Sequence, residues 1–258
     1  MAAEGDIRGR GEAQWQAILA RRRGAPIGSI GAGELEALYG PLCVPAPGES
    51  FAVAHLAQSL DGRIAAAAGA SRWISGEEDL CHTHRMRALA DAVIVGADTI
   101  LHDDPLLTVR RCAGPHPVRV VIDPERKLPP HHQVFADRGA RTIVIVASDH
   151  ENVSPARDGE TLVLPRDGSV IAPATITEAL ARRGLHWLFI EGGGVTISNF
   201  LRAGCLDRLQ LTIAPLLLGS GRPSLTLPEI AEPSLGLRPQ IRRFSLGADT
   251  LFECIFGR

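Results

Sequence analysis

The sequence Glu191-Gly-Gly-Gly194 lies directly after the apolar run Trp187 to Ile190 and directly before a helical pattern. A strand, a glycine turn and a helix N-terminus form a site for a phosphate or pyrophosphate, because unpaired backbone N–H groups point outward and glycine permits close approach. The alternative is a tight turn with no ligand. The spacing differs from the G-x-G-x-x-G of the Rossmann fingerprint, so a dinucleotide that binds here does so in another fold.

Two arginines are candidates for a second anion site. Arg87 lies near the end of a predicted helix, and Arg110 follows the loop Asp103-Asp-Pro105. A guanidinium group can donate two parallel hydrogen bonds to a phosphate, which makes both residues candidates for a phosphate clamp. The alternative for each arginine is a solvent-exposed salt bridge. The clamp also requires a fold that brings these two segments together.

No metal site is expected. Cys81, His82 and His84 are only one or two positions apart on a predicted helix, where such neighbours do not face each other. The five cysteines are scattered and include no Cys-x-x-Cys pair, which argues against a zinc ribbon and a disulfide framework.

The elements that must position these residues follow an α/β pattern from Phe51 onward. Short β-rich runs alternate with helical stretches, and several runs are continuously apolar, which is typical of a sheet covered on both faces. The predicted strands are 51–57, 92–96, 118–123, 141–147, 161–164, 186–191, 209–215 and 251–256. The predicted helices are 75–90, 176–183 and 196–203. The last strands lack intervening helices, which predicts an antiparallel C-terminal portion.

Residues 1–50 are expected to form an N-terminal extension, and residues 51–258 to form the main domain. The stretch 12–23 places Trp15, Ile18 and Leu19 on one helical face, which predicts a short docking helix. The following run Gly40 to Gly48 contains three prolines and is predicted to be a linker.

Composition excludes several classes of protein. The chain has 258 residues, of which 45% are hydrophobic and 22% charged, close to the average of globular proteins. Its net charge of −2 gives no electrostatic reason to expect nucleic acid or an anionic membrane as partner. We find no apolar run near the 20 residues of a membrane helix and no secretory signal pattern, so a cytoplasmic location is expected.

In their order along the chain, these segments resemble the reductase domain of riboflavin biosynthesis, which in many bacteria is one half of a bifunctional pyrimidine deaminase/reductase. The motifs that carry this resemblance are Ala57-x-Ser-Leu-Asp-Gly62, Gly69-x-Ser-x-Trp-Ile74, Arg87-Ala-x-x-Asp-Ala92, Gly96-x-x-Thr-x-Leu-x-Asp-Asp-Pro105, Leu107-Thr-x-Arg110, Arg119-x-Val-x-Asp123, Glu191-Gly-Gly193 and Ala214-Pro-x-Leu-Leu-Gly219. The resemblance implies a dihydrofolate-reductase-like α/β fold, with a mainly parallel central sheet flanked by helices. It also implies NADPH as hydride donor and a homodimer.

The resemblance also implies roles for individual residues. The cofactor-binding residues it implies are Ala57, Trp73, Thr99, Asp103, Gly193, Gly194, Val195, Thr196, Ile197, Ser198 and Asn199. The substrate-binding residues it implies are Ser71, Arg87, Leu107, Arg110 and Glu191. Asp103 and Glu191 are the carboxylates that the motifs place best for assisting proton transfer. Ser148, after a predicted strand, is the candidate for selecting the 2′-phosphate of NADPH.

The implied reaction is the reduction of 5-amino-6-(5-phosphoribosylamino)uracil to its ribitylamino product. The alternatives are reduction of the undeaminated diaminopyrimidinone or of another pyrimidine or pterin, and a non-catalytic dimeric nucleotide-binding module. The chain departs from the family pattern at His55, where lysine is frequent, and at Arg208, where an acidic residue is frequent. The His-x-Glu and Pro-Cys-x-x-Cys motifs of the zinc deaminase half do not occur in this sequence.

Overall fold

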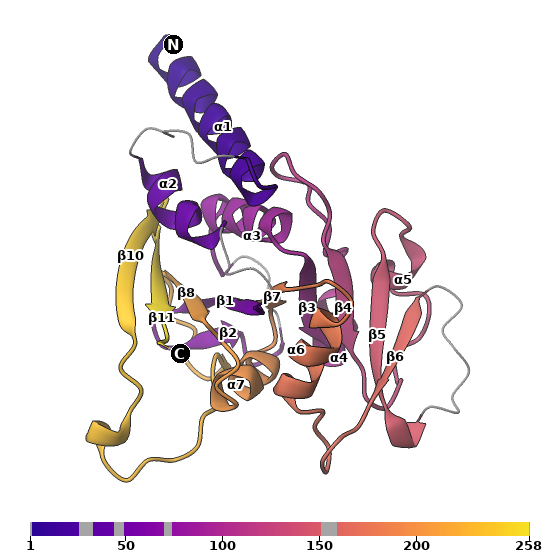
Figure 1. The fold of residues 1–258 in the computed structure, drawn as a ribbon. Helices are drawn as coiled ribbons and strands as arrows, with labels where there is room; N and C mark the ends of the chain where they lie inside the picture. Colours follow the sequence, from indigo (N-terminus) through magenta and orange to yellow (C-terminus); the bar gives the residue numbers. More distant parts are fainter. Residues whose placement is uncertain (1, 26–32, 44–48, 70–73, 151–158, 258) are drawn as a thin grey trace.

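The computed structural model of the chain (Figure 1) describes residues 2–25, 33–43, 49–69, 74–150 and 159–257. The strands are β1 (Phe51–Ser59), β2 (Arg63–Ala65), β3 (Ala92–Gly96), β4 (Val118–Ile122), β5 (Thr142–Ala147), β6 (Glu160–Leu164), β7 (Trp187–Glu191), β8 (Arg208–Ala214), β9 (Arg222–Pro223), β10 (Gln240–Leu246) and β11 (Asp249–Ile255). The α-helices are α1 (Ala2–Arg22), α2 (Glu34–Tyr39), α3 (Glu77–Leu89), α4 (Ala97–Asp103), α5 (Gln133–Ala136), α6 (Pro173–Ala181) and α7 (Gly194–Arg202). Three short 3₁₀ helices cover Gly40–Leu42, Ser148–His150 and Pro233–Leu235. Across the described ranges, no helix combines the length and apolar character needed to cross a membrane.

Nine strands form one central sheet in the order β10-β11-β8-β1-β7-β3-β4-β5-β6. Every pairing from β8 through β6 is parallel, whereas β11 pairs antiparallel with both β8 and β10. The predicted fold class, a mainly parallel sheet with antiparallel C-terminal strands, is therefore confirmed. A separate two-stranded ladder joins β2 and β9.

Helices cover both faces of the sheet because successive side chains of a strand point to opposite faces. Val53 of β1 belongs to a core cluster that also contains buried residues of α1, α2 and α3. Its neighbours Ala52 and Ala54 belong to a second cluster with residues of α6 and α7. Figure 1 shows the first three helices on one side of the sheet and α6 and α7 on the other.

The N-terminal extension packs into the first of these clusters. Trp15, Ile18 and Leu19 are buried, as the helical face predicted, and the indole Nε1 of Trp15 donates to the carbonyl oxygen of Ala113 at 2.8 Å. The hydroxyl of Tyr39 lies 2.7 Å from Nδ1 of His82 on α3. The extension and α3 therefore share one core. Residues 44–48 of the predicted linker lie outside the described residues.

The eight predicted strands and four predicted helices are all present, with ends that differ by a few residues. The largest difference is α1, which begins at Ala2 rather than at residue 12. The prediction missed α2, α4 and α5, which are only four to seven residues long, and the strands β2, β9 and β10. In β10 the apolar residues Ile241, Phe244 and Leu246 do not alternate strictly with polar ones, so the period-two signal is absent.

Candidate active site

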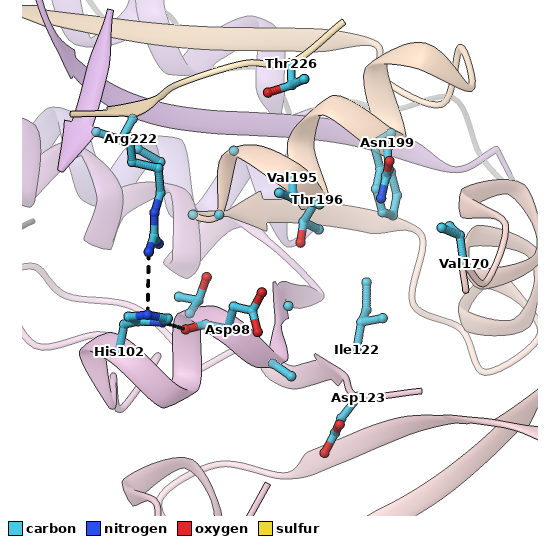
Figure 2. Close-up of a pocket in the computed structure, with 18 of the residues that line it drawn as sticks. Asp98, His102, Ile122, Asp123, Val170, Val195, Thr196, Asn199, Arg222 and Thr226 are labelled. Carbon is cyan, nitrogen blue, oxygen red and sulfur yellow. Dashed lines mark hydrogen bonds between the residues drawn. The ribbon is translucent and has the colours of Figure 1, made fainter. Parts of the chain in front are cut away.

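A cleft of about 740 Å³ opens along the carboxyl edge of the parallel strands. Its walls come from the ends of β1, β3 and β4, the glycine turn after β7, the helices α4, α6 and α7, and the segment that contains β9 (Figure 2). Pockets for small ligands and cofactors have volumes of about 300–1,000 Å³ and occur at this edge of open α/β sheets.

The predicted glycine turn forms the centre of one wall. Gly192 and Gly193 have φ values of +72° and +69°, a left-handed conformation that favours glycine. A Cβ atom on Gly193 would lie 3.0 Å from Oγ1 of Thr99, and one on Gly194 would overlap the carbonyl oxygen of Ser224. The first N–H groups of α7, which follow this turn, have no partners within the helix. The turn therefore forms a cradle that added side-chain atoms would obstruct.

A second strand–glycine–helix turn lies beside the first, because β3 pairs directly with β7. Gly96 ends β3 and α4 begins at the next residue. A Cβ atom on Gly96 would lie 2.6 Å from Oγ1 of Thr196, so the two turns are in close contact. Thr99 and Asp103 of α4 both line the cleft.

The structure brings eight of the eleven predicted cofactor residues into this cleft: Ala57, Thr99, Asp103, Gly193, Gly194, Val195, Thr196 and Asn199. Ile197 and Ser198 do not line it, because they lie on the buried face of α7. Oγ of Ser198 instead accepts a hydrogen bond of 2.9 Å from the backbone N–H of Thr226. Ser148 does not line the cleft either. Trp73, like Ser71, lies outside the described residues.

Arg87 and Glu191 form a buried ion pair between the last turn of α3 and the end of β7. Nε of Arg87 donates to Oε2 of Glu191 at 2.7 Å, and Nη2 donates to Oε1. Nη1 donates to the carbonyl oxygen of Thr108 at 2.9 Å. Each guanidinium nitrogen of Arg87 thus already has a protein acceptor. The role of Arg87 as a phosphate clamp stays a prediction; in the structure its planar fork is directed at Glu191.

Arg110 keeps an exposed guanidinium group close to this pair. Its Nη1 donates to Oγ1 of Thr108 at 2.7 Å, and its backbone N–H donates to Nδ1 of His84 at 2.9 Å. Burial, together with Arg87 and Arg110, lowers the pKa of His84 to about 4. The predicted substrate residue Leu107 is fully buried in the core, with φ of +57°. Its side chain therefore packs against protein.

The two adjacent aspartates of the α4 loop have different positions. Asp103 lines the cleft, whereas Asp104 anchors the loop to α5. Oδ1 of Asp104 accepts from the backbone N–H of Gln133 at 2.8 Å and lies 3.1 Å from Nδ1 of His132. Asp104 adopts a left-handed conformation with φ of +40°, which is uncommon for a residue other than glycine.

His55 is buried beside Glu191, its partner in the register of β1 and β7. Its Nε2 lies 3.0 Å from Oδ1 of Asp79 and 3.2 Å from Oγ1 of Thr212. Although burial alone raises the pKa of Asp79, the nearby His55 holds it below its usual range. The sequence identified His55 only as a departure from the family pattern, because its partner Asp79 carries no motif of its own.

The turn Ser59-Leu-Asp-Gly62 fixes a distant loop. Oδ1 of Asp61 accepts from the hydroxyl of Ser59 at 2.5 Å and from the backbone N–H of Leu218 at 3.1 Å. Oδ2 accepts from the backbone N–H of Gly219 at 2.6 Å. These hydrogen bonds lower the pKa of Asp61 to about 2. The turn predicted from local chemistry thus positions the segment that leads into β9.

Comparison with known proteins places this architecture in a family. The model of the RibD C-terminal domain matches residues 51–244, three quarters of the chain. The chain belongs to the RibD C-terminal domain family. A structure of a deaminase/5-amino-6-(5-phosphoribosylamino)uracil reductase from Thermotoga maritima aligns with a TM-score of 0.69 and 26% identity, over 80% of this chain and 56% of that one.

Three of the curated relatives differ in how much of their own length this chain covers. A 2,5-diamino-6-ribosylamino-4(3H)-pyrimidinone 5′-phosphate reductase of Methanothermobacter thermautotrophicus is 36% identical over 79% of this chain and 96% of its own. A reductase of the same name from Archaeoglobus fulgidus is 33% identical over 69% of this chain and 85% of its own. RibD of Aquifex aeolicus is also 36% identical, but the chain spans only 46% of its length.

Proposed function

We propose that this chain is an NADPH-dependent reductase of a phosphoribosylaminopyrimidine in riboflavin biosynthesis. The observation that carries the proposal is the cleft, where eight residues expected to bind the cofactor meet around a glycine cradle. NADPH supplies a hydride when bound. The cradle at the start of α7 would hold its pyrophosphate, and the apolar side chains of Val170, Ile171 and Ile176 would cover its adenine.

The reaction adds one hydride and one proton to the substrate. The opened ribose presents a carbon–nitrogen double bond, whose carbon takes the hydride and whose nitrogen takes the proton. Asp103 is the residue we assign to assist the proton transfer, because it is the predicted catalytic carboxylate that lines the cleft. Glu191 is assigned to orienting the substrate site through its pair with Arg87. The chain's main contribution is to align the reactants and exclude water.

The undeaminated pyrimidinone is the favoured substrate. The relatives from Methanothermobacter thermautotrophicus and Archaeoglobus fulgidus that carry its name align with this chain over 96% and 85% of their own length. The uracil form, which the sequence analysis placed first, is the second candidate and is favoured by the RibD relatives. NADPH oxidation by the purified protein, measured with each pyrimidine in turn, tests both. The absence of turnover with either substrate would contradict the proposed function.

Arg110 is the residue we assign to the substrate phosphate. A hydrogen bond to a charged group contributes about 1.5–3 kcal/mol, so Arg110→Ala should lower kcat/KM about 10- to 150-fold. The affinity for NADPH should stay unchanged. Arg111→Ala is the matched control, because its exposed guanidinium pairs with Glu77 instead. A loss of NADPH affinity in Arg110→Ala would place this arginine on the cofactor. The homodimer implied by the resemblance stays a prediction, which sedimentation of the purified protein tests.

A further inference from the structure

One wall of the cleft, the strap of residues 221–226, was not identified from the sequence. Its backbone is held by close packing at both ends. A Cβ atom on Gly221 would overlap the carbonyl oxygen of Ala65, and one on Gly194 would overlap that of Ser224. The backbone N–H of Ser224 donates to the carbonyl oxygen of Gly62 at 3.0 Å. The strap is therefore packed directly against the cradle at the start of α7.

The side chain of Arg222 extends from this strap across the cleft to His102 on α4 (Figure 2). Nη2 of Arg222 lies 3.5 Å from Nε2 of His102, and Nδ1 of His102 lies 2.6 Å from the carbonyl oxygen of Asp98. Because a carbonyl can only accept, Nδ1 carries the proton and Nε2 presents its lone pair to the guanidinium. His102 thus orients Arg222 and occupies only one of the five N–H donors of its guanidinium group.

The charges around the cleft leave Arg222 available for an anion. Four carboxylates line the cleft, from Asp98, Asp103, Asp123 and Glu125, against the cations of Lys127 and Arg222. Lys127 is already paired with Asp98 at 3.1 Å. Across the described residues, no carboxylate forms an ion pair with Arg222. An anionic ligand in this acidic cleft needs an uncommitted cation, and Arg222 supplies one.

We propose that Arg222 binds the pyrophosphate of the dinucleotide together with the α7 cradle against which its strap packs, with His102 as its positioning residue. This inference rests on the proposed function, because it assumes that a dinucleotide occupies the cleft. The cradle offers backbone N–H dipoles, whereas Arg222 offers a full charge and a planar fork that matches phosphate oxygens.

The test is nucleotide binding to the whole protein by isothermal titration calorimetry, without pyrimidine. Arg222→Gln should raise the Kd for NADPH about 10- to 100-fold, the loss expected for a charge-assisted hydrogen bond. Arg222→Lys should recover part of this loss. Adenosine 2′-monophosphate, which has no pyrophosphate, should bind the wild type and Arg222→Gln equally well. Arg182→Gln is the matched control, because Arg182 is exposed directly after α6 and pairs with Glu178.

The positioning role of His102 has its own readout. His102→Ala should weaken NADPH binding less than Arg222→Gln does, and it should have no further effect in the Arg222→Gln background. An independent effect of His102→Ala in that background would overturn the positioning role.

Two results would overturn the role of Arg222 while leaving the proposed function in place. The first is an unchanged Kd for NADPH in Arg222→Gln, given tight binding by the wild type. The second is a rise only in the KM of the phosphorylated pyrimidine, which would assign Arg222 to the substrate. Failure of the wild type to bind any nicotinamide nucleotide would overturn both proposals.

Discussion

Gly194→Ala tests whether the strap is packed on the start of α7 as tightly as the structure indicates. An added Cβ would lie well inside 3.0 Å of the carbonyl oxygen of Ser224, a distance that real Cβ atoms do not reach. The obstructing atoms belong to backbone, so the conflict cannot be relieved by a side-chain rotation. The strap must move away from α7, and the hydrogen bond from Thr226 to Ser198 must lengthen or break.

The cost follows from two opposing contributions. Overpacking a close contact costs about 1–3 kcal/mol, whereas alanine is favoured over glycine in a helix by up to about 1 kcal/mol. Because the overlap is with backbone atoms, we take the upper part of the overpacking range, about 2–3 kcal/mol, and expect a net loss of about 1–3 kcal/mol in the free energy of unfolding. For a chain of this size, each kcal/mol lowers Tm by about 2–4 °C. The affinity for NADPH should fall as well, because the displaced strap carries Arg222.

Urea unfolding and calorimetry measure this loss, and Gly11→Ala is the control. Gly11 also lies in a helix, but an added Cβ would meet nothing within 4 Å. Its replacement should leave stability unchanged or raise it by up to about 1 kcal/mol. If Gly194→Ala were as stable as the wild type, the packing argument for the strap would be wrong.

Three further predictions concern other parts of the molecule. Lys127→Ala should raise the Kd for NADPH about tenfold more than that for NADH, because only NADPH carries a 2′-phosphate and the exposed pair of Lys127 with Asp98 is weak enough to be exchanged for it; equal changes in the two titrations would contradict this. Trp15→Ala should cost about 3–5 kcal/mol in urea unfolding, since the indole is fully buried and hydrogen-bonded, and a cost below about 1 kcal/mol would show that the extension packs loosely. Folding lowers the pKa of His84 from 6.5 to about 4. As the pH falls, the unfolded chain therefore binds a proton at His84 before the folded chain does. The free energy of unfolding should decrease as the pH falls between these two values. In His84→Asn, unfolding measured across this range should show a shallower decrease than in the wild type.

Much of the fold could be predicted because its signals are local. The buried parallel strands are continuous apolar runs, and α6 and α7 carry apolar residues at helical spacing. The strand β10 could not be found this way, because its two adjacent arginines interrupt the alternation. What makes it a strand is its pairing with β11 across the turn at Gly247.

The candidate site was predictable where a motif is contiguous and not where partners are distant. The glycine turn can be identified from four consecutive residues. Arg87 and Glu191 were each singled out by type, but their ion pair joins positions 104 residues apart, and no spacing rule reveals it. The strap was not predicted either, because its place in the cleft depends on contacts with Gly194 and Ala65, which are distant in the sequence.

The N-terminal extension packs on α3, a helix that also pairs with residues near the candidate site, although the family match begins only at residue 51. Tyr39 contacts Nδ1 of His82, whose Nε2 lies 2.9 Å from the side-chain oxygen of Gln210 on β8. The same helix carries Asp79, which pairs with His55, and Arg87, which forms an ion pair with Glu191. Because α3 contacts the extension on one side and these charged pairs on the other, we expect a substitution at Tyr39 to shift the Arg87–Glu191 pair, which a lower kcat/KM at unchanged affinity for NADPH would show.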